Sequence, residues 1–321
     1  MFNTDLMSLL VCPACKVNLC WKNCTLACQQ CGQSYPILNG VPILINETNS
    51  IFSIRDYELQ CNHSNLVHQV GSRLPKLEQW LRSVIPDICR NIPSASNFGK
   101  FEALLLEKTN QPIVLVIGAG IEGAEMSKIL QNCTIRFVQT DVIMTPSIQI
   151  VLDGHDIPFK SEVIDGVIIQ AVLEHVVDPY RVVQEIHRVL KPEGLVYAET
   201  PFMQQVHMGK YDFTRFTHLG HRRLFRNFEE IESGAACGAG SALAWTWEHF
   251  LLSFCGSSRS LRKVIALFVR FMLFGLPYLD KFTISTPGTL DAASSYYFLG
   301  AKSSLALSDR LLLQHYRGAQ R

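Results

Sequence analysis

The pattern of hydrophobic positions is most regular between residues 112 and 200. Short β-branched runs there alternate with helical patterns of apolar residues. The predicted strands are residues 113–117, 136–140, 148–152, 163–170 and 195–200, and the predicted helices between them are 124–130 and 180–190. Strands that alternate with helices indicate a parallel, doubly wound sheet, so the sequence predicts an α/β fold.

The pattern is different on either side of this region. Residues 49–98 place apolar side chains at helical spacing and end in a Pro/Ser/Asn-rich stretch at 92–97, which predicts a helical connector followed by a linker. Apolar residues accumulate again in 242–282, and residues 294–302 predict a closing strand that returns to the sheet.

The apolar part of 242–282 is interrupted by basic residues, Gly275 and Pro277. It is too short and too broken for a transmembrane helix. We expect a helical cap within the α/β domain, or a segment that pairs subunits. The alternative is a basic amphipathic helix at 259–279 that makes peripheral contact with a membrane.

Composition narrows the class of protein. Hydrophobic residues make up 48% and charged residues 18% of the 321 residues, which excludes a disordered chain. Lys and Arg (29) nearly balance Asp and Glu (28), so there is no general attraction to nucleic acid. The first residues lack the basic region of a secretory signal, and we expect a cytoplasmic protein, with the membrane contact above as a variation.

Six of the eleven cysteines lie in the first 31 residues. Cys12 and Cys15 form one CxxC turn, and Cys28 and Cys31 form a second one twelve residues later. Two facing turns of this kind supply four thiolates in the geometry of structural Zn²⁺, so the sequence predicts a zinc site. The alternative is a metal-free or redox cluster. Cys20 and Cys24 are expected to line the hairpin between the turns.

A glycine-rich turn, Gly118-x-Gly120-x-x-Gly123, follows the first predicted strand of the α/β region, and Asp141 ends the next strand. Such a loop lets the backbone approach a ligand, and the acidic residue can bind the hydroxyls of a ribose. Glu122 at the start of the helix would repel the pyrophosphate of NAD but tolerate the sulfonium of S-adenosylmethionine, which favours the methyl donor. The alternative is a glycine turn without a ligand.

Three motifs carry a resemblance to a known family. They are Asp-Gly-His-Asp-Ile-Pro-Phe at 153–159, Leu-Glu-His-Val-Val-Asp-Pro at 173–179 and Glu-Ile-His-Arg-Val-Leu-Lys-Pro-Glu-Gly at 185–194. With the glycine loop, they make residues 113–200 resemble the type 11 family of class I S-adenosylmethionine-dependent methyltransferases. The resemblance implies a Rossmann-like methyltransferase sheet and a cofactor site formed by Gly118, Gly120, Gly123, Asp141, Asp153, Gly154 and Gln170.

In that implied site the glycine loop surrounds the methionine moiety and Asp141 binds the ribose. Asp153 and Gly154 lie near the adenine, and Gln170 lines the floor. The chain departs from the family at one place: the strand before the loop often ends in an acidic residue there, whereas Val116 and Ile117 stand here.

A second resemblance covers about the first 46 residues. The cysteine spacing and the tail Tyr-Pro-Ile-Leu-Asn-Gly-Val-Pro-Ile-Leu-Ile at 35–45 resemble a short zinc-ribbon family that includes the eukaryotic activator subunit of tRNA and protein methyltransferases. The domains we expect are a zinc ribbon at 1–48, a helical connector at 49–98, a methyltransferase domain at 99–303 with a substrate loop and helical cap inserted at 204–290, and a tail at 304–321.

The loop after the strand at 195–200 lies where open α/β sheets bind ligands. It contains His207, Tyr211, Asp212 and Arg215. We expect His207 or Asp212 to be the catalytic base, and Tyr211 and Arg215 to contact the substrate. The alternative is a polar lid whose charges pair with each other. His175 is expected to be a packed, hydrogen-bonded residue.

The sequence therefore predicts a methyltransferase for a small-molecule, sugar-linked or lipid-linked acceptor. One alternative is an rRNA or tRNA methyltransferase, because bacterial rRNA guanine methyltransferases also join a four-cysteine module to this fold and residues 215–226 are basic. A solvated helix face is the more ordinary interpretation of that stretch. The other alternative is a non-catalytic adaptor that binds S-adenosylmethionine.

Overall fold

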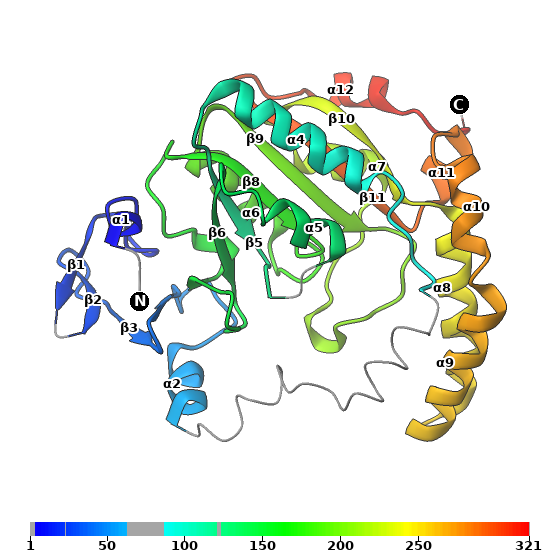
Figure 1. The fold of residues 1–321 in the computed structure, drawn as a ribbon, viewed down its shortest axis with the longest axis horizontal. Coiled ribbons are helices and arrows are strands. Elements are labelled where there is room, and N and C mark those ends of the chain that lie inside the picture. The colour runs from blue at the N-terminus through cyan, green and yellow to red at the C-terminus, as the bar shows by residue number, and fades with distance from the viewer. Residues whose placement is uncertain (1–3, 23, 63–86, 121–122, 321) are drawn as a thin grey trace.

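The described residues of the computed structural model, 4–22, 24–62, 87–120 and 123–320, build one continuous sheet with helices on both faces (Figure 1). The helical positions predicted at 74–85, and Glu122, lie outside the described residues. The strand order is β1-β2-β3-β4-β7-β6-β5-β8-β9-β11-β10.

The centre of the sheet consists of five parallel strands, which are β5 (Ile113–Ile117), β6 (Arg136–Asp141), β7 (Ile150–Leu152), β8 (Ile164–Gln170) and β9 (Leu190–Pro201). Strand β5 is almost wholly apolar and is buried on both faces, as the strands of a parallel sheet are when helices cover them. All five predicted strands and the α/β fold class are confirmed.

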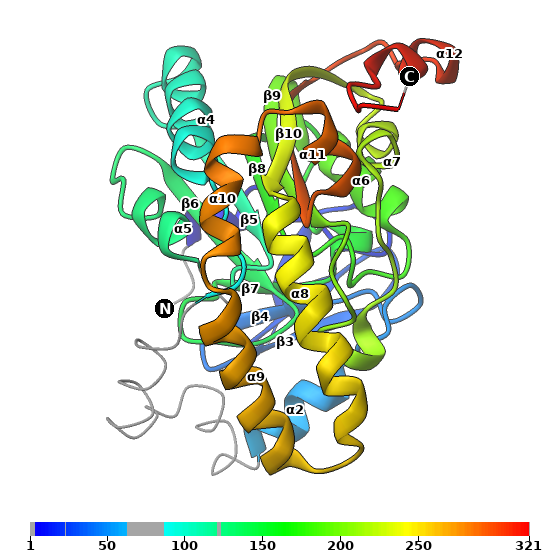
Figure 2. The same cartoon turned by 90° about the vertical axis from the view of Figure 1, so that its right-hand side faces the viewer.

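Helices α4 (Ser94–Lys108) and α5 (Ala124–Ile129) cover one face of this sheet, and α6 (Pro179–Val189) and α7 (His218–Leu224) cover the other (Figures 1 and 2). Helix α4 begins inside the stretch that the sequence predicted as a linker, so that prediction is wrong from Ser94 onward. Its apolar face places Phe101 and Leu105 in the core, against Gly166 of β8.

Two antiparallel strands complete the sheet. The predicted closing strand is confirmed as β11 (Ser295–Lys302), which pairs with β9. Strand β10 (Phe228–Cys237) pairs with β11 at the outer edge. It lies inside the segment predicted as loop and helical cap. Its mixture of acidic, glycine and alanine residues lacks the alternation of apolar residues that predicts a strand.

The cysteine-rich segment continues the same sheet at the other edge. It comprises α1 (Thr4–Met7), β1 (Leu19–Lys22), β2 (Thr25–Cys28), β3 (Ser34–Leu38) and β4 (Val41–Leu44). Strand β4 pairs in parallel with β7, with Ile43 opposite Val151. The turn between β3 and β4 has positive φ at Asn39 and Gly40, as Asn-Gly hairpin turns do. Helix α2 (Ile54–Asn62) follows.

Four helices stand at the opposite end of the molecule, which are α8 (Ala239–Leu252), α9 (Arg259–Leu273), α10 (Leu276–Thr283) and α11 (Pro287–Ala292). Helices α8 and α9 lie side by side and extend beyond the sheet (Figures 1 and 2). Val269 is the buried residue of α9, whereas most of its apolar side chains are exposed. The helices predicted here are present, but α9 does not cover the sheet as a cap would. Helix α12 (Asp309–Leu312) lies near the C-terminus.

No helix in the described ranges combines the length and the apolarity needed to cross a bilayer. The predicted domain boundaries stay a prediction, although β4 joins the sheet of the following domain.

Candidate cofactor and acceptor site

The carboxyl ends of the five parallel strands meet at one edge of the sheet, and the predicted site residues follow them. After β5, Gly118 has φ +83° and lies so close to Val172 that a Cβ there would meet its Cγ2 at 2.1 Å. The amide of Gly120 donates to Asp141 Oδ2 at 2.7 Å. The loop thus adopts a tight path that glycine permits, and its backbone lies against the acidic residue.

Asp141 stands at the end of β6, as predicted. Its Oδ1 accepts from the amide of Ile143 at 2.8 Å, and its Oδ2 accepts from Gly120. Burial raises the pKa of Asp141 above its ordinary value. Each oxygen of a carboxylate has two lone pairs, so both can still accept from the hydroxyls of a ribose. The residues therefore fit an adenosine-containing cofactor.

Asp153 directly follows β7 and caps the short 3₁₀ turn Gly154–Asp156. Its Oδ1 accepts from the backbone amide of His155 and lies 2.6 Å from its ring Nδ1, while its Oδ2 accepts from Ser50 Oγ at 2.5 Å. Burial raises the pKa of Asp153, but the interactions with His155 outweigh it and leave the pKa below its ordinary value. The carboxylate thus holds the segment that follows the zinc ribbon.

That segment closes the site from the side of β4. The Tyr57 hydroxyl donates to the carbonyl of Val142 at 2.6 Å, next to Asp141. Phe52 stacks on Tyr211 of the loop after β9, with ring centroids 6.0 Å apart. Sequence reasoning missed Ser50, Phe52 and Tyr57, because no spacing rule connects them to residues a hundred positions away.

Gln170 ends β8 and donates to Glu199 Oε2 at 2.8 Å. Glu199 is buried on β9 and also accepts from Asn91 at 2.8 and 2.9 Å and from Tyr197. Burial raises the pKa of Glu199. Gln170 is therefore held by a buried carboxylate that the sequence did not single out.

The loop after β9 brings Asp212 and Arg215 together. Arg215 binds both oxygens of Asp212, one of them at 2.7 Å, and the backbone amide of His207 donates to the same carboxylate at 2.9 Å. Burial raises the pKa of Asp212, but the Arg215 guanidinium outweighs it and lowers the pKa to about 2. So acidic and so well paired a carboxylate is a poor base. For Asp212 and Arg215 the structure favours the alternative of charges that pair with each other.

His207 lies instead beside two residues that follow β8. Its ring is 4.8 Å from that of His175, and the Nε2 atoms of His207 and His175 lie 3.9 and 3.7 Å from Glu174 Oε1. Glu174 is 1% exposed, and burial raises its pKa to about 8. His175 is hydrogen-bonded, as expected, but it also faces this group. Glu174 was missed, because only burial distinguishes it from an ordinary surface carboxylate.

The four predicted zinc ligands form a second cluster. The Sγ atoms of Cys12, Cys15, Cys28 and Cys31 all lie within 4.8 Å of one another, with Cys12–Cys31 at 3.7 Å and Cys15–Cys28 at 3.3 Å. Tetrahedral Zn²⁺ with Zn–S bonds of about 2.3 Å spaces its sulfurs about 3.8 Å apart, so the thiols fit this metal with small adjustments.

Cys20 and Cys24 belong to the β1–β2 hairpin, as expected. Cys20 lies in β1, and Cys24 is exposed at the turn between the strands with φ 63°. Among the described residues, neither belongs to the four-thiol group.

The basic stretch at 215–226 is engaged within the chain. Arg222 is buried and lies 2.8 Å from Glu230, and Arg223 and Arg226 lie 3.1 and 3.5 Å from Asp309. The expectation of a solvated helix face is therefore wrong for Arg222. These ion pairs also leave fewer cations for the phosphates of an RNA.

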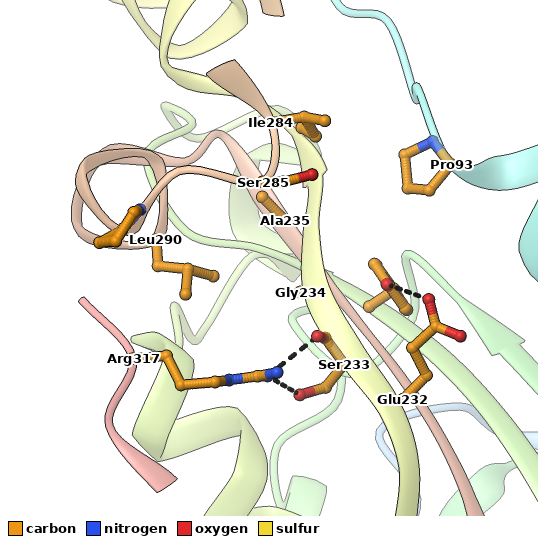
Figure 3. A pocket seen from close by; sticks show the side chains of 11 residues that line it. Pro93, Glu232, Ser233, Gly234, Ala235, Ile284, Ser285, Leu290 and Arg317 are labelled. Atoms are coloured by element: carbon orange, nitrogen blue, oxygen red, sulfur yellow. Dashed lines mark hydrogen bonds between the residues drawn. The ribbon is translucent and has the colours of Figure 1, made fainter. Parts of the chain in front are cut away.

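A hollow of about 430 Å³ lies elsewhere, along the edge strand β10 (Figure 3). Arg317 reaches into it and donates to Ser233 Oγ at 2.6 Å. Strand β10 is three places from β8 in the sheet, so this hollow is separate from the carboxyl-end site.

Comparisons with known proteins agree with this arrangement. Residues 116–198 match a family profile described as a methyltransferase domain, and residues 3–40 match that of the Trm112p-like proteins. No curated protein matches the chain significantly.

Similar solved structures are distant. The 1,6-didemethyltoxoflavin-N1-methyltransferase of Burkholderia thailandensis is 11% identical, with a TM-score of 0.40, over 86% of this chain and 98% of that chain. The phosphoethanolamine N-methyltransferase 2 of Haemonchus contortus is 13% identical, with a TM-score of 0.39, over 64% and 53%. The complex between the Haloferax volcanii Trm112 methyltransferase activator and a methyltransferase is 16% identical, with a TM-score of 0.38, over 65% and 91%.

The sheet, the glycine loop and the domain match define the protein as a class I S-adenosylmethionine-dependent methyltransferase. It carries a type 11 methyltransferase domain and a Trm112-like zinc ribbon on one polypeptide. The predicted enzyme class and methyl donor are confirmed.

Proposed function

We propose that this methyltransferase modifies a hydroxyl group of a lipid-linked acceptor at the surface of an anionic membrane. The observation that carries the proposal is that helix α8 borders both the acceptor loop and an exposed apolar, basic surface. Gln205 of the loop donates to Thr246 Oγ1 at 3.2 Å, and the ring of Trp245 lies 6.3 Å from that of His207.

The cofactor part of the site follows from the geometry of the carboxyl ends. Gly118, Gly120 and Gly123 would surround the methionine moiety, and Asp141 would bind the ribose. Asp153 and Gly154 would lie near the adenine, with Tyr57 beside them, and Gln170 would line the floor of the site. S-adenosylmethionine supplies a methyl group already activated by its sulfonium, so the chain's own task is to align the acceptor and exclude water.

The acceptor part is the loop after β9 together with the residues that follow β8. The ion pair between Arg215 and Asp212 fixes the loop, and the hydrogen bond that the backbone amide of His207 donates to the Asp212 carboxylate fixes the position of His207. Tyr211 stacks on Phe52 at the border with the cofactor site. A hydroxyl that enters here meets Glu174, His175 and His207, which are the groups that can assist its deprotonation.

The membrane part is the outer surface of α8, α9 and the short turn Ser253–Cys255 between them. Phe254, Phe268 and Met272 are 71%, 59% and 65% exposed. Exposed apolar side chains that gather on two neighbouring helices mark an interaction site, since soluble proteins rarely leave a large apolar patch bare.

The charges on this surface select the partner. Arg259 and Lys263 are exposed beside the apolar residues, whereas the acidic residues of α8–α10, Glu248 and Asp280, are both buried. A surface that is apolar and basic, without an exposed carboxylate, complements an anionic lipid headgroup layer above its acyl chains.

Vesicle sedimentation tests the membrane part. We expect the protein to bind vesicles that contain phosphatidylglycerol and to lose about tenfold or more of that affinity in the double variant Phe268→Ser/Met272→Ser, since each buried apolar side chain contributes about 1.5–3 kcal/mol. The matched control is Leu305→Ser/Leu313→Ser, which removes two side chains of the C-terminal segment that are 80% and 67% exposed.

Equal binding by wild type and the α9 variant would overturn the membrane proposal. So would a dimer in light scattering that dissociates in the α9 variant while no vesicles bind, because the surface would then contact a second copy of the chain.

The acceptor is tested by incubation with methyl-labelled S-adenosylmethionine and a total lipid extract. Label in the organic phase supports a lipid-linked acceptor, and label confined to the aqueous phase contradicts it.

A further inference from the structure

Glu174, His175 and His207 form a compact group that methyl transfer by alignment alone does not require. Glu174 and His175 follow β8, and His207 comes from the loop after β9, so the sheet brings them together from positions 32 residues apart. One ligand atom of each, a carboxylate oxygen and two imidazole nitrogens, lies within 4.8 Å of the others.

Glu174 is the unusual member. Its side chain is 1% exposed, and within the described residues neither of its carboxylate oxygens has a hydrogen-bond donor. A buried ionised carboxylate is costly unless a cation compensates it. The neighbouring cation, Arg215, is committed to Asp212 and to the carbonyls of Gln204 and Gln205.

The two histidines are oriented so that their Nε2 atoms face Glu174. His175 Nδ1 lies 2.8 Å from the carbonyl oxygen of Tyr211, and His207 Nδ1 lies 3.3 Å from that of Gln205. A carbonyl oxygen only accepts, so His175 Nδ1 carries its proton and His175 Nε2 offers its lone pair. His207 Nδ1 faces a second acceptor, Asp212 Oδ2, at 3.5 Å and also the Arg215 guanidinium at 3.5 Å. With the proton of His207 on Nδ1, toward the two acceptors, its Nε2 offers its lone pair as well. Histidines that bind metals are oriented in this way by a backbone carbonyl or a carboxylate behind the ring.

We infer that Glu174, His175 and His207 bind a divalent transition-metal cation, with coordination positions left open for the acceptor. Two imidazoles and one carboxylate are a donor set that Mn²⁺, Fe²⁺, Co²⁺ and Zn²⁺ accept. The Nε2 atoms stand 3.7 and 3.9 Å from Oε1. Metal–ligand bonds of about 2.1 Å require separations of about 3.0–3.5 Å. Each nitrogen therefore needs to approach Oε1 by about 0.5 Å, and the ligand atoms of the two histidines lie within 4.8 Å of each other.

The consequence for the reaction rests on the proposed function, whereas the ion site itself does not. A hydroxyl oxygen at an open position loses its proton to water more readily, because the cation stabilises the negative charge left behind. That oxygen then forms a bond with the methyl carbon. The bond from this carbon to sulfur breaks, and its electron pair stays on sulfur to give S-adenosylhomocysteine. The acceptor is thus an alcohol, a sugar hydroxyl or a phenol, not an amine that already has a free lone pair.

Manganese binding tests the ion site without relying on activity. The full chain with zinc in its ribbon is titrated with Mn²⁺, and free Mn²⁺ is followed by electron paramagnetic resonance. Mn²⁺ prefers oxygen and nitrogen donors to thiolates, so it reports on this group and not on the four cysteines. We expect one Mn²⁺ per chain, with at least a tenfold loss of affinity in Glu174→Gln, His175→Asn and His207→Asn.

Two variants outside the site serve as controls. Glu229→Gln removes an exposed carboxylate of β10, and His315→Asn removes a histidine near the C-terminus. Both should bind Mn²⁺ as wild type does. Unchanged binding of S-adenosylhomocysteine shows that each site variant is folded. Of the three, His207→Asn should disturb the core least, because His207 lies on a loop.

The inference is overturned if wild type binds no Mn²⁺ up to about 1 mM, an affinity too weak for a resident ion. It is also overturned if the three site variants retain wild-type affinity. Its failure is distinguishable from that of the proposed function. Label in lipids without Mn²⁺ binding refutes the ion site alone, and Mn²⁺ binding without label in lipids refutes the lipid-linked acceptor alone.

Discussion

Single glycines decide how closely the cofactor loop approaches Asp141. A Cβ on Gly120 would stand 2.7 Å from Asp141 Oδ2, where backbone and carboxylate are already hydrogen-bonded. A Cβ on Gly123 would meet nothing within 4 Å. The two positions belong to the same motif in the sequence, yet the structure has room for a side chain at Gly123 and none at Gly120.

We expect Gly120→Ala to weaken binding of S-adenosylhomocysteine by about tenfold or more, since the added methyl group must displace the carboxylate that would bind the ribose. Gly123→Ala should bind within about twofold of wild type, because its methyl group enters open space. Isothermal calorimetry measures both. Equal losses in the two variants, or none in Gly120→Ala, would contradict the placement of the cofactor at Asp141.

His221 determines part of the pH dependence of stability. It is buried among Phe216, Phe225 and Phe298, and burial lowers its pKa to about 3. The unfolded chain has an ordinary histidine pKa of about 6.5. As the pH falls below that value, the unfolded state binds a proton that the folded state does not, so stability is present above pH 6.5 and is lost on acidification.

The expected loss from His221 is about 1.4 kcal/mol in the free energy of unfolding for each pH unit below about 6. In His221→Leu that contribution disappears, and urea unfolding at pH 7 and pH 5 should show a smaller difference than in wild type. If the two proteins lose the same stability between these pH values, His221 is not buried in its neutral form.

The residues that could be predicted from the sequence are those whose role follows from local spacing. The four cysteines lie in two CxxC turns, and Asp141 ends a strand directly after a glycine loop, so the pattern alone indicated where they would lie. Glu174 and His207 could not be paired in this way. Their contact depends on the path of the loop after β9, which Arg215 and Asp212 fix by an ion pair that the sequence offered only as an alternative.

At the scale of elements, hydrophobic periodicity predicted those strands and helices whose surroundings are the same along the whole segment. Strands β5, β7, β8 and β9 are buried along most of their length, so their apolar runs were visible. Strand β10 lies at an edge with alternating exposure over its first half, and its acidic residues suggested a loop. Helix α9 was recognised as amphipathic, but amphipathicity cannot tell whether the apolar side meets the protein or a lipid surface.

At the scale of the whole molecule, the zinc ribbon and the cofactor site form one unit. Lys16, which follows the first CxxC turn, lies 2.8 Å from Glu185 of α6, and β4 extends the catalytic sheet at β7. In the segment after β4, the Ser50 hydroxyl donates a hydrogen bond to Asp153, and the Tyr57 hydroxyl donates one to the carbonyl of Val142, next to Asp141. Unfolding of the ribbon should therefore weaken binding of the cofactor.

We expect removal of zinc to weaken binding of S-adenosylhomocysteine by about tenfold, because loss of a structural metal unfolds a small four-cysteine module and releases the segment that closes the site. The same effect should follow from Cys28→Ser, measured by calorimetry with the melting temperature recorded in parallel. Cys24→Ser is the matched control, since it removes an exposed thiol of the same ribbon that lies outside the four-thiol group.

The control should retain both the affinity and the melting temperature of wild type. A ribbon that loses its metal while cofactor affinity stays unchanged would show that the catalytic sheet is complete without β4 and that Ser50 and Tyr57 hold their places independently. A tenfold loss confined to the zinc-free protein and to Cys28→Ser would instead show that the ribbon, through β4 and the segment after it, does within one chain what a separate activating subunit would do for a partner.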